Sequence, residues 1–530
     1  MLIDMKEYNR TMTEPFGKDN VKGNNLILSK HVRLAASAVM EKKTEVNANT
    51  CIIGTSGRGD FESLLPNLME AKGSFVIMDI MGDCYAHCAD FLEKQGYRIR
   101  CLNLDRPEEG DSYNPFAYIR DEDDIVALTS AIMGTKTGRE PKMDAFWDKC
   151  EAALINAVIS FVKEMLILKM SQVSYLLRQD IRELDKIFDR AGKEDGFEFA
   201  VRQYKIFKTA LLDTQNSIRL SAGVKLQIFD LEEIQSTTKW DNMHLGTLDE
   251  DKTALFVILS GHDCTFKMLG NMLISQVYRL IQPIEDESDA SYAVEEGVDY
   301  TPLPIRIYLR DMENMGYIPN LADYLNTVQA YGMTTDIRVN SVARLQELYP
   351  DQWEAILNNC GSVIFMAGQA DETTSEWFSR KTGEIKQSID FTQEKKTRKK
   401  KEPVEITPLS LEQIRTMKEE YCLIIQGLDR AFLDEKYRAS DHPNWKYCDG
   451  AHRANPKDRK NIAQECPVCG IPEELKEVVS MVEDGKGMDV RVKKKAFVKR
   501  HKSVICLTAA GLLAGAGTYL LARSIRKKRG

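Results

Sequence analysis

The stretch CIIGTSGRGDFESLLPNLMEAKGSFVIMDIMGD, residues 51–83, decides the fold. It contains an apolar run, a turn with Gly54, Gly57 and Gly59, a helical segment, and a second apolar run that ends at Asp79. This order predicts a strand, a glycine-rich loop, a helix and a second strand, as in phosphate loops that bind nucleoside triphosphates. The G-x-x-x-x-G spacing leaves N–H groups for an anion, although an ordinary glycine turn explains the same residues equally well.

The residues that follow the loop are not those that bind phosphate and Mg²⁺ in a phosphate loop. A phosphate loop continues with Lys and then Ser or Thr, which contact the phosphates and Mg²⁺, whereas Asp60 and Phe61 follow Gly59 here. Asp60 replaces attraction to a polyanion by a repulsion of about 1 kcal/mol in water and about 4 kcal/mol in a surface cleft, for charges ~4 Å apart. Phe61 removes the hydroxyl that would hold the metal. Both residues argue against binding of ATP and Mg²⁺.

Composition predicts a soluble, globular body with several domains. The chain has 530 residues, 43% of them hydrophobic and 29% charged, and a net charge of −8. This charge argues against a surface that coats nucleic acid over its whole extent. The first residues are polar and most cysteines are scattered, so we expect no signal peptide and a reducing compartment.

Alternating strand and helix patterns flank a purely helical stretch. They predict an α/β fold with a mostly parallel sheet and an inserted all-helical domain, whose helices are expected over residues 145–167, 174–191 and 199–213. We divide the chain into an N-terminal segment (1–50), two parts of the α/β domain (51–143 and 236–440), the helical insertion (144–235), a zinc module (441–490) and a basic juxtamembrane segment with a transmembrane helix (491–530).

Several segments together resemble the TraG/TraD-type coupling proteins of type IV secretion and conjugation. They lie in the family's order over roughly residues 20–447, and they are GTSGRG (54–59), PNLM (66–69), IMGD (80–83), YNPFAYIRDEDD (113–124), FWDKCEAAL (146–154), KTALFVILS (252–260), MGYIPN (315–320), NNCGSVIFMAG (358–368) and LDRAFLDEKYRASDHPNWKY (428–447). The resemblance implies a RecA-like P-loop NTPase-type domain with a helical insertion. It also implies a hexamer at the inner membrane that receives a relaxase–DNA cargo and passes it to the type IV secretion channel using ATP.

The chain departs from this family where ATP chemistry takes place. The family's Gly-Lys-Thr/Ser becomes Gly59-Asp60-Phe61, its D-P-K-G-E becomes residues 79–83, its strand-end Asp-Glu pair falls on Arg310 and Asp311, and its Gln-rich sensor strand falls on residues 340–343. Four changes in one pocket predict a degenerate nucleotide site with no catalytic residue. Its degenerate equivalents are Asp60, Arg310 and Asp311, and its remaining pocket residues are Gly54, Gly57, Gly59 and Asp79.

The reversed charges also suggest what replaces the nucleotide. In the implied fold Asp60 and Arg310 face each other across the site, so we expect a carboxylate–guanidinium pair that joins the loop to the strand. Such a pair would set the register of these elements more than it would add net stability.

Two groups of cysteines are candidate metal ligands. Cys448, His452, Cys466 and Cys469 form C-x3-H-x13-C-x2-C, a spacing that favours a structural tetrahedral zinc site. His442 is a possible substitute ligand. The alternative is a pair of surface thiols and an unrelated histidine. Cys84, His87 and Cys88 share a helix face and bind a metal or, more commonly for cysteine, pack in the core.

A basic segment indicates contact with DNA, and an apolar segment indicates a membrane anchor. Residues Lys395–Lys401 (KKTRKKK) either contact the phosphates of transferred DNA or form a solvated loop. Ser503–Ala522 is an uncharged segment long enough to span a bilayer, with basic flanks. We therefore expect one C-terminal transmembrane helix in the inner or plasma membrane, with the bulk of the chain cytoplasmic.

Three functions follow. The first is a membrane-anchored homologue of conjugative coupling proteins that recruits or scaffolds without hydrolysing ATP. The second is an active ATP-driven DNA translocase with unorthodox pocket residues. The third is a zinc-dependent membrane adaptor that keeps the old fold as a platform.

Overall fold

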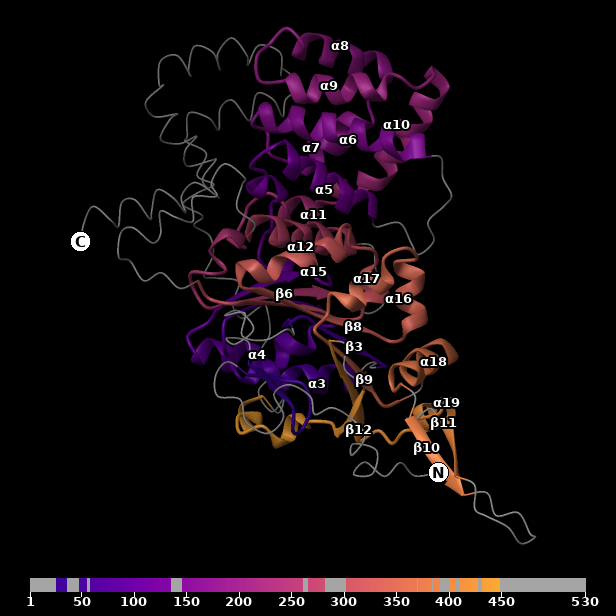
Figure 1. Ribbon diagram of the computed structural model, residues 1–530. Coiled ribbons are helices and arrows are strands. Elements are labelled where there is room, and N and C mark those ends of the chain that lie inside the picture. The colour runs from indigo at the N-terminus through magenta and orange to yellow at the C-terminus, as the bar shows by residue number, and fades with distance from the viewer. Residues whose placement is uncertain are drawn as a thin grey trace, which may run out of the picture. The chain divides into compact units, whose positions relative to one another are not determined.

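A computed structural model describes residues 25–35, 47–54, 58–134, 145–260, 266–281, 302–368, 370–383, 385–390, 401–406, 409–427 and 431–448. The described residues up to Tyr97 and from Pro304 onward form one compact unit, which we call unit 1. Those from Arg98 to Leu303 form a second, unit 2. Figure 1 shows both, coloured along the chain.

A sheet forms the centre of unit 1. Its strands lie in the order β13-β12-β9-β3-β8-β7-β4. The parallel strands are β3 (Thr50–Ile53), β4 (Ser74–Ile80), β7 (Ile305–Leu309), β8 (Met333–Val339) and β9 (Ser362–Met366). Strands β12 (Tyr421–Gln426) and β13 (Phe432–Glu435) continue the sheet in antiparallel fashion.

The parallel strands are buried along almost their whole length. Every residue of β3, β7, β8 and β9 is buried, and β4 is buried up to Asp79. Continuous apolar runs of this kind are expected where helices cover both faces of a parallel sheet. The α/β class with a mostly parallel sheet is therefore confirmed.

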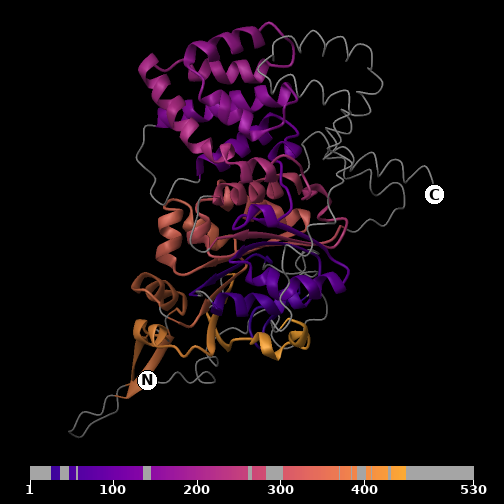
Figure 2. The same ribbon diagram turned by 180° about the vertical axis from the view of Figure 1, so that it is seen from behind.

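Helices cover the two faces of this sheet. Helices α3 (Arg58–Met69) and α4 (Asp83–Lys94) lie on one face, and α15 (Leu321–Thr327), α16 (Val342–Leu348) and α17 (Trp353–Asn358) lie on the other (Figures 1 and 2). The smaller elements of unit 1 are β1 (Asn25–Ile27), β2 (Arg33–Ala35), α14 (Met312–Met315), η6 (Val328–Tyr331), α18 (Glu372–Lys381), β10 (Ile385–Asp390), β11 (Lys401–Ile406), α19 (Leu411–Arg415), η7 (Ala439–Asp441) and η8 (Trp445–Tyr447).

Unit 2 joins a pair of parallel strands to a set of helices. The strands are β5 (Arg98–Asn103) and β6 (Thr253–Leu259). The helices are η1 (Pro107–Glu109), η2 (Pro115–Tyr118), α5 (Glu122–Gly134), α6 (Ala145–Glu164), α7 (Met170–Leu177), α8 (Ile181–Ala191), α9 (Glu198–Phe207), α10 (Leu212–Leu226), η3 (Gln227–Asp230), α11 (Glu232–Thr237), η4 (Leu245–Thr247) and α12 (Lys267–Ile281). Helices therefore do fill the stretch where the sequence predicts them.

Two expected helices are interrupted. The predicted helix over residues 174–191 is wrong as one element, because α7 ends at Leu177 and α8 begins at Ile181. Asp180 causes the break, since its carboxylate accepts a hydrogen bond from the N–H of Glu183 (2.9 Å) and caps α8. The predicted helix over residues 199–213 is likewise split, between α9 and α10.

Candidate functional site: a strand-end pocket with internal ion pairs

The carboxyl ends of the parallel strands bring the predicted pocket residues to one edge of the unit 1 sheet. Gly54 follows β3, Asp79 lies near the end of β4, and Arg310 and Asp311 follow β7. Ligands of open α/β sheets bind at this edge. Gly54, Asp79, Arg310 and Asp311 therefore lie where a nucleotide would bind in such a fold.

The loop after β3 requires glycine at its first position. Gly54 has φ +89°, and a Cβ atom there would lie 2.7 Å from the carbonyl oxygen of Met366. Glycine is needed because both the backbone conformation and the close strand exclude a side chain. Gly57 lies outside the described residues, while Gly59 and Asp60 lie in the first turn of α3, where no side chain is described.

Phe61 fills the position at which a phosphate loop has its metal-binding hydroxyl. Its ring is buried and packs edge-on against the ring of His87 on α4, with 4.7 Å between the ring centroids. An apolar ring offers no oxygen to Mg²⁺, a cation that takes oxygen ligands. This contact stabilises the packing of α3 on α4 instead.

Asp79 caps the helix that follows it. Its carboxylate accepts hydrogen bonds from the N–H groups of Cys84 (3.0 Å) and Tyr85 (2.7 Å), the first turn of α4. The side chain has no exposed surface, and burial raises its pKa, while Arg310 opposes that rise. Asp79 is thus held in place by the protein itself.

Arg310 forms a buried ion pair with this same carboxylate. The guanidinium Nη1 lies 2.9 Å from Oδ1 of Asp79 and 3.2 Å from Sγ of Cys84. The side chains of Arg310 and Asp79 are 4% and 0% exposed. Sequence reasoning placed both residues in the pocket but missed this pair, and the Asp60–Arg310 pair stays a prediction because the Asp60 side chain is not described.

Two acidic side chains crowd the end of β7. Asp311 adopts φ +50° at the start of α14, and Glu313 accepts a hydrogen bond from the N–H of Asn340 (2.6 Å). Burial raises the pKa of Glu313 from 4.5 to about 7; the Asn340 N–H opposes the rise, and Asp311 adds to it. Glu313 was not predicted, and its position two residues after Asp311 is the only sequence signal for it.

Glu313→Gln should remove a pH dependence of stability. The folded protein holds the Glu313 proton up to about pH 7, against 4.5 without the shift, so stability falls as pH rises through that window. The neutral amide avoids this loss, which makes the variant more stable than the parent by on the order of 2 kcal/mol at pH 8 and equal to it below pH 4. Urea unfolding at both pH values measures the difference, and parallel pH curves for the two proteins would contradict it.

The residues aligned with the sensor strand begin a helix. Ser341 caps α16, since its hydroxyl accepts a hydrogen bond from the N–H of Arg344 (3.2 Å). The N–H of Val342 donates to the Thr374 hydroxyl (2.9 Å). These polar groups are thus satisfied within the protein.

A second charged network lies inside the sheet, on the face covered by α3. Asp336 on β8 pairs with Arg338 (Nε–Oδ1 2.6 Å) and with Arg306 on β7 (Nη2–Oδ2 3.6 Å). Its Oδ2 accepts a hydrogen bond from the Thr50 hydroxyl (2.8 Å), and Arg338 donates to the Ser63 hydroxyl on α3 (2.5 Å). This network joins three strands to the helix that follows the glycine loop.

Among the predicted zinc ligands, only Cys448 lies within the described residues. It is buried, and its thiol hydrogen-bonds with that of Cys88 on α4. His452, Cys466 and Cys469 lie outside the described residues. Within the described part of the chain no cluster of three or more His, Cys, Asp or Glu side chains is arranged to hold a metal.

The side chains of His442 and of the two cysteines of α4 are packed inside the protein. His442 is buried; its Nε2 lies 3.2 Å from Oε1 of Glu70, and its Nδ1 accepts a hydrogen bond from the N–H of Asn444 (3.1 Å). Both ring nitrogens are therefore already engaged. Cys84 and Cys88 are fully buried, whereas His87 is partly exposed.

The DNA-binding and membrane segments fall largely outside the described residues. Residues 395–400 are not described, while Lys401 begins β11 and lies opposite Asp390 on β10. The predicted transmembrane helix, residues 503–522, is likewise not described. Across the described ranges, no helix is both long and apolar enough to cross a bilayer.

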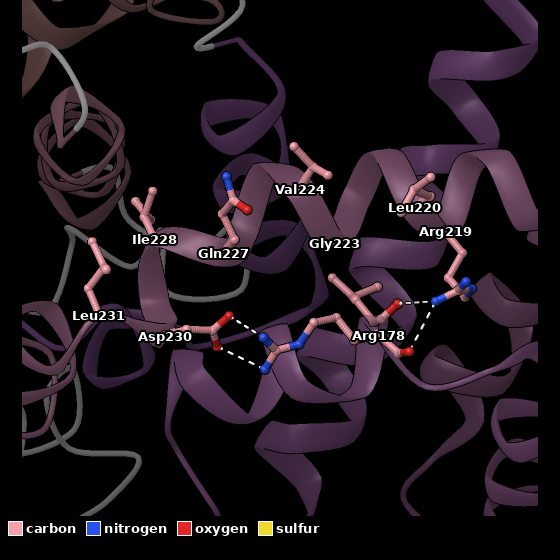
Figure 3. Close-up of a pocket in the computed structure, with 10 residues that line it drawn as sticks. Arg178, Arg219, Leu220, Gly223, Val224, Gln227, Ile228, Asp230 and Leu231 are labelled. Atoms are coloured by element: carbon pink, nitrogen blue, oxygen red, sulfur yellow. Dashed lines mark hydrogen bonds and ion pairs between the residues drawn. The ribbon is translucent and has the colours of Figure 1, made fainter.

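Unit 2 carries a hollow of about 460 Å³ along α10 (Figure 3). Leu220 and Val224 line it and are 61% and 54% exposed. The Arg178 guanidinium pairs with the Asp230 carboxylate through bonds of 2.5 and 3.0 Å, and Arg219 donates to the carbonyl oxygens of residues 177 and 178. The hollow thus offers apolar contact surface, and its charged groups already have partners.

Comparisons with known proteins agree on the fold. A sequence profile of the family described as "Type IV secretory system Conjugative DNA transfer" matches residues 22–427. The solved structure of the bacterial conjugative coupling protein TrwBdeltaN70, in its unbound form, has a TM-score of 0.58 at 14% identity and covers 82% of this chain and 92% of that one. The plasmid coupling protein TrwB in complex with ADP and Mg²⁺ has a TM-score of 0.57 at 14% identity, with coverage of 82% and 93%.

At this identity the likeness to TrwB is one of fold alone: an α/β domain with a mostly parallel sheet. No sequence among the curated proteins matches the chain.

Proposed function

Because the chain belongs to the family of type IV secretory system proteins for conjugative DNA transfer, we propose that it is a coupling-protein homologue that recruits or scaffolds without hydrolysing ATP. The buried Arg310–Asp79 ion pair carries this proposal. By resemblance, Arg310 stands where family members have the aspartate that holds Mg²⁺. A guanidinium at that point repels the metal and occupies the neighbouring carboxylate.

The first turn of α3 supports the same conclusion. Phosphoryl transfer depends on positioning and on cations that spread the developing charge. Asp60 carries the opposite charge to the lysine it replaces, and Phe61 is packed against His87. We extend the proposal to a triad of Asp60, Arg310 and Asp79, in which Arg310 attracts both carboxylates. The protein's own side chains would then take the place of nucleotide and metal.

Turnover measurements test this proposal. The purified protein should release no phosphate from ATP above background, with or without single-stranded or duplex DNA, because charge stabilisation in the pocket is missing. An intact coupling protein assayed beside it controls for the DNA and buffer. DNA-stimulated turnover by this chain would contradict the proposal.

A charge reversal provides the matched variant. Asp60→Lys combined with Arg310→Asp restores the family's charges at both positions, so it should recover measurable ATP binding. Each single change leaves two like charges at the site and should lower the melting temperature. If both single variants behave like the parent, the proposed triad fails.

The active translocase is the second candidate, and one observation favours it. Asp311 and Glu313 still place two carboxylates at the end of β7, and the pKa of Glu313 is raised by burial to about 7, a value suited to a general base. On this alternative, Glu313→Gln abolishes turnover. The same phosphate-release assay therefore separates the two functions.

Recruitment would use the segments that lie beyond the pocket. We propose that Lys395–Lys401, which ends at the start of β11, contacts DNA phosphates, and that Ser503–Ala522 anchors the chain in the inner or plasma membrane with most of it cytoplasmic. Type IV secretion channel proteins and a relaxase–DNA cargo are the proposed partners, in a homo- or hetero-oligomer that is a hexamer in the family.

A structural zinc ion completes the proposal. Cys448, His452, Cys466 and Cys469 supply four ligands for a module at residues 441–490 that has little apolar content of its own. In the third candidate function this module is the adaptor, and the α/β domain is only its platform. Partners captured from cells that depend on Cys466 and Cys469 would favour the adaptor.

A further inference from the structure

The hollow in unit 2 lies between two rows of side chains on α10 and on η3, which follows it directly. Residues four positions apart share one face of a helix, and each such row forms a ridge along it. One row consists of Leu220, Val224 and Ile228, and the other of Arg219, Gly223 and Gln227. All of these residues line the hollow. The hollow is therefore a groove between two neighbouring ridges.

Gly223 makes the gap in the second ridge. It lies in the interior of α10, and a Cβ atom there would be 3.7 Å from Cγ of Arg178 and 3.8 Å from the carbonyl oxygen of Leu177, which are ordinary contacts. Alanine would therefore fit, and it favours a helix more than glycine does. The packing of α10 thus does not require glycine, and the effect of Gly223 is to deepen the middle of the hollow.

The first ridge is apolar and largely exposed. Leu220 and Val224 are 61% and 54% exposed, and Leu231 at the end of the hollow is 44% exposed. Neighbouring exposed apolar side chains of this kind are typical of surfaces that bind another protein. In Figure 3 the apolar ridge and the Arg178–Asp230 pair lie on opposite sides of Gly223. An amphipathic helix has the matching arrangement, with an apolar row beside a polar one.

The charged side of the hollow has more positive than negative charge. Arg178 is neutralised by Asp230 through hydrogen bonds of 2.5 and 3.0 Å. Arg219 donates to two carbonyl oxygens at the end of α7 (3.3 and 3.1 Å), and among the described residues no carboxylate pairs with it. Carbonyl groups carry only partial charges, so the guanidinium of Arg219 attracts an anionic group from outside the unit.

We propose that this hollow binds an amphipathic helix of a partner protein. Its apolar row packs between the two ridges, and the neighbouring row places a carboxylate beside Arg219. The exposed acidic residues Glu232 and Glu233 follow the far end of the hollow and would repel a carboxylate there, so the acidic group belongs at Arg219. The inference gives the proposed recruitment a surface. It does not depend on the loss of ATP hydrolysis, because the pocket residues belong to unit 1.

Two synthetic helical peptides test the charge preference. Both carry leucines in an i, i+4 row, and beside the middle of that row one has glutamate and the other lysine. Fluorescence anisotropy with the full-length protein should show at least ~5-fold tighter binding of the glutamate peptide. Arg219→Gln should remove this difference. Equal affinities of the parent for the two peptides, or a preference for lysine, would overturn the proposal.

Two matched leucine variants test the location. Leu211 is 80% exposed and directly precedes α10, but it does not line the hollow. Leu220→Gln should weaken binding of the glutamate peptide at least ~10-fold, whereas Leu211→Gln should bind like the parent. Gly223→Leu, whose side chain fills the hollow, should also weaken binding, and circular dichroism checks that each variant is folded. Equal losses for the two leucine variants would refute this location.

Sedimentation velocity tests whether a second copy of the chain covers the hollow instead. Leu220→Gln should sediment like the parent, because the proposed occupant is another protein. If Leu220→Gln dissociates an oligomer that Leu211→Gln leaves intact, a second copy occupies the hollow and the proposal is wrong. Turnover of ATP by the parent would contradict the proposed function but would leave these peptide results unchanged, so the two proposals fail separately.

Discussion

Arg310→Leu should lower the free energy of unfolding by about 3–5 kcal/mol, because it leaves the Asp79 carboxylate buried without its guanidinium. The two side chains are 4% and 0% exposed, and their charged atoms lie 2.9 Å apart. Removal of one member of a buried pair is far more harmful than loss of an exposed pair. Urea unfolding followed by circular dichroism measures the change.

The stability of Arg310→Leu should fall as the pH rises. Burial already raises the pKa of Asp79, and Arg310 opposes that rise, so removing Arg310 raises the pKa further. The folded variant then binds a proton that the unfolded chain releases, and its stability falls as pH rises above about 4. The deficit relative to the parent should therefore be larger at pH 8 than at pH 5.

Two variants control for this result. Asp79→Asn combined with Arg310→Leu should be more stable than Arg310→Leu alone, because a neutral amide needs no buried counterion and its single oxygen still accepts one of the two α4 N–H groups. Arg344→Ala breaks an exposed pair with Glu347, whose members are 59% and 58% exposed, and should change stability by less than about 1 kcal/mol. Equal losses for Arg344→Ala and Arg310→Leu would refute a special role for the buried pair.

Asp336→Asn should destabilise unit 1 by a similar amount, about 3–5 kcal/mol. Arg306 is 7% exposed, and its Nε and Nη1 have no hydrogen-bond partner among the described residues, so the Asp336 carboxylate is its main compensation. The same carboxylate contacts Arg338 at 2.6 Å. Thermal melting and the yield of soluble protein report the loss.

A second substitution separates charge from packing in this network. Arg306→Met removes the guanidinium but keeps a long side chain, so Asp336→Asn with Arg306→Met should be more stable than Asp336→Asn alone. If the double variant is less stable than the single one, the network acts through shape and not through charge.

The sequence predicts the α/β fold of this protein because the apolar runs that mark buried strands are local patterns. Buried runs such as FVIM before Asp79 and IRIYL before Arg310 are recognisable as interior strands, and parallel pairing places their ends at one edge. In the structure, Arg310 lies at this edge beside Asp79. The break before α8 was also readable in principle, since Asp180 and Glu183 have the spacing of a helix cap.

The ion pairs escaped prediction because they depend on which strands are neighbours. Asp336 and Arg338 lie two residues apart on β8, and the order β3-β8-β7 brings Thr50 and Arg306 to them. The sequence pattern indicates that Asp79 belongs to the pocket, but nothing in the pattern predicts that its carboxylate accepts hydrogen bonds from the start of α4. The contact between Cys88 and Cys448 joins distant segments and has no local signal at all.

These interactions share one physical effect. At the edge where a nucleotide and its metal would bind, Arg310 and Asp79 connect β7 to β4 and to the start of α4. Farther inside the sheet, the buried network around Asp336 connects β3, β7 and β8 to α3. We therefore expect this framework to keep its shape without a ligand, as the proposed scaffold function requires.

Calorimetric titration of Mg·ATP into the purified protein tests the central claim most directly. The account predicts no saturable binding below about 1 mM nucleotide, with DNA present or absent. Saturable binding with a dissociation constant below about 1 mM would contradict it.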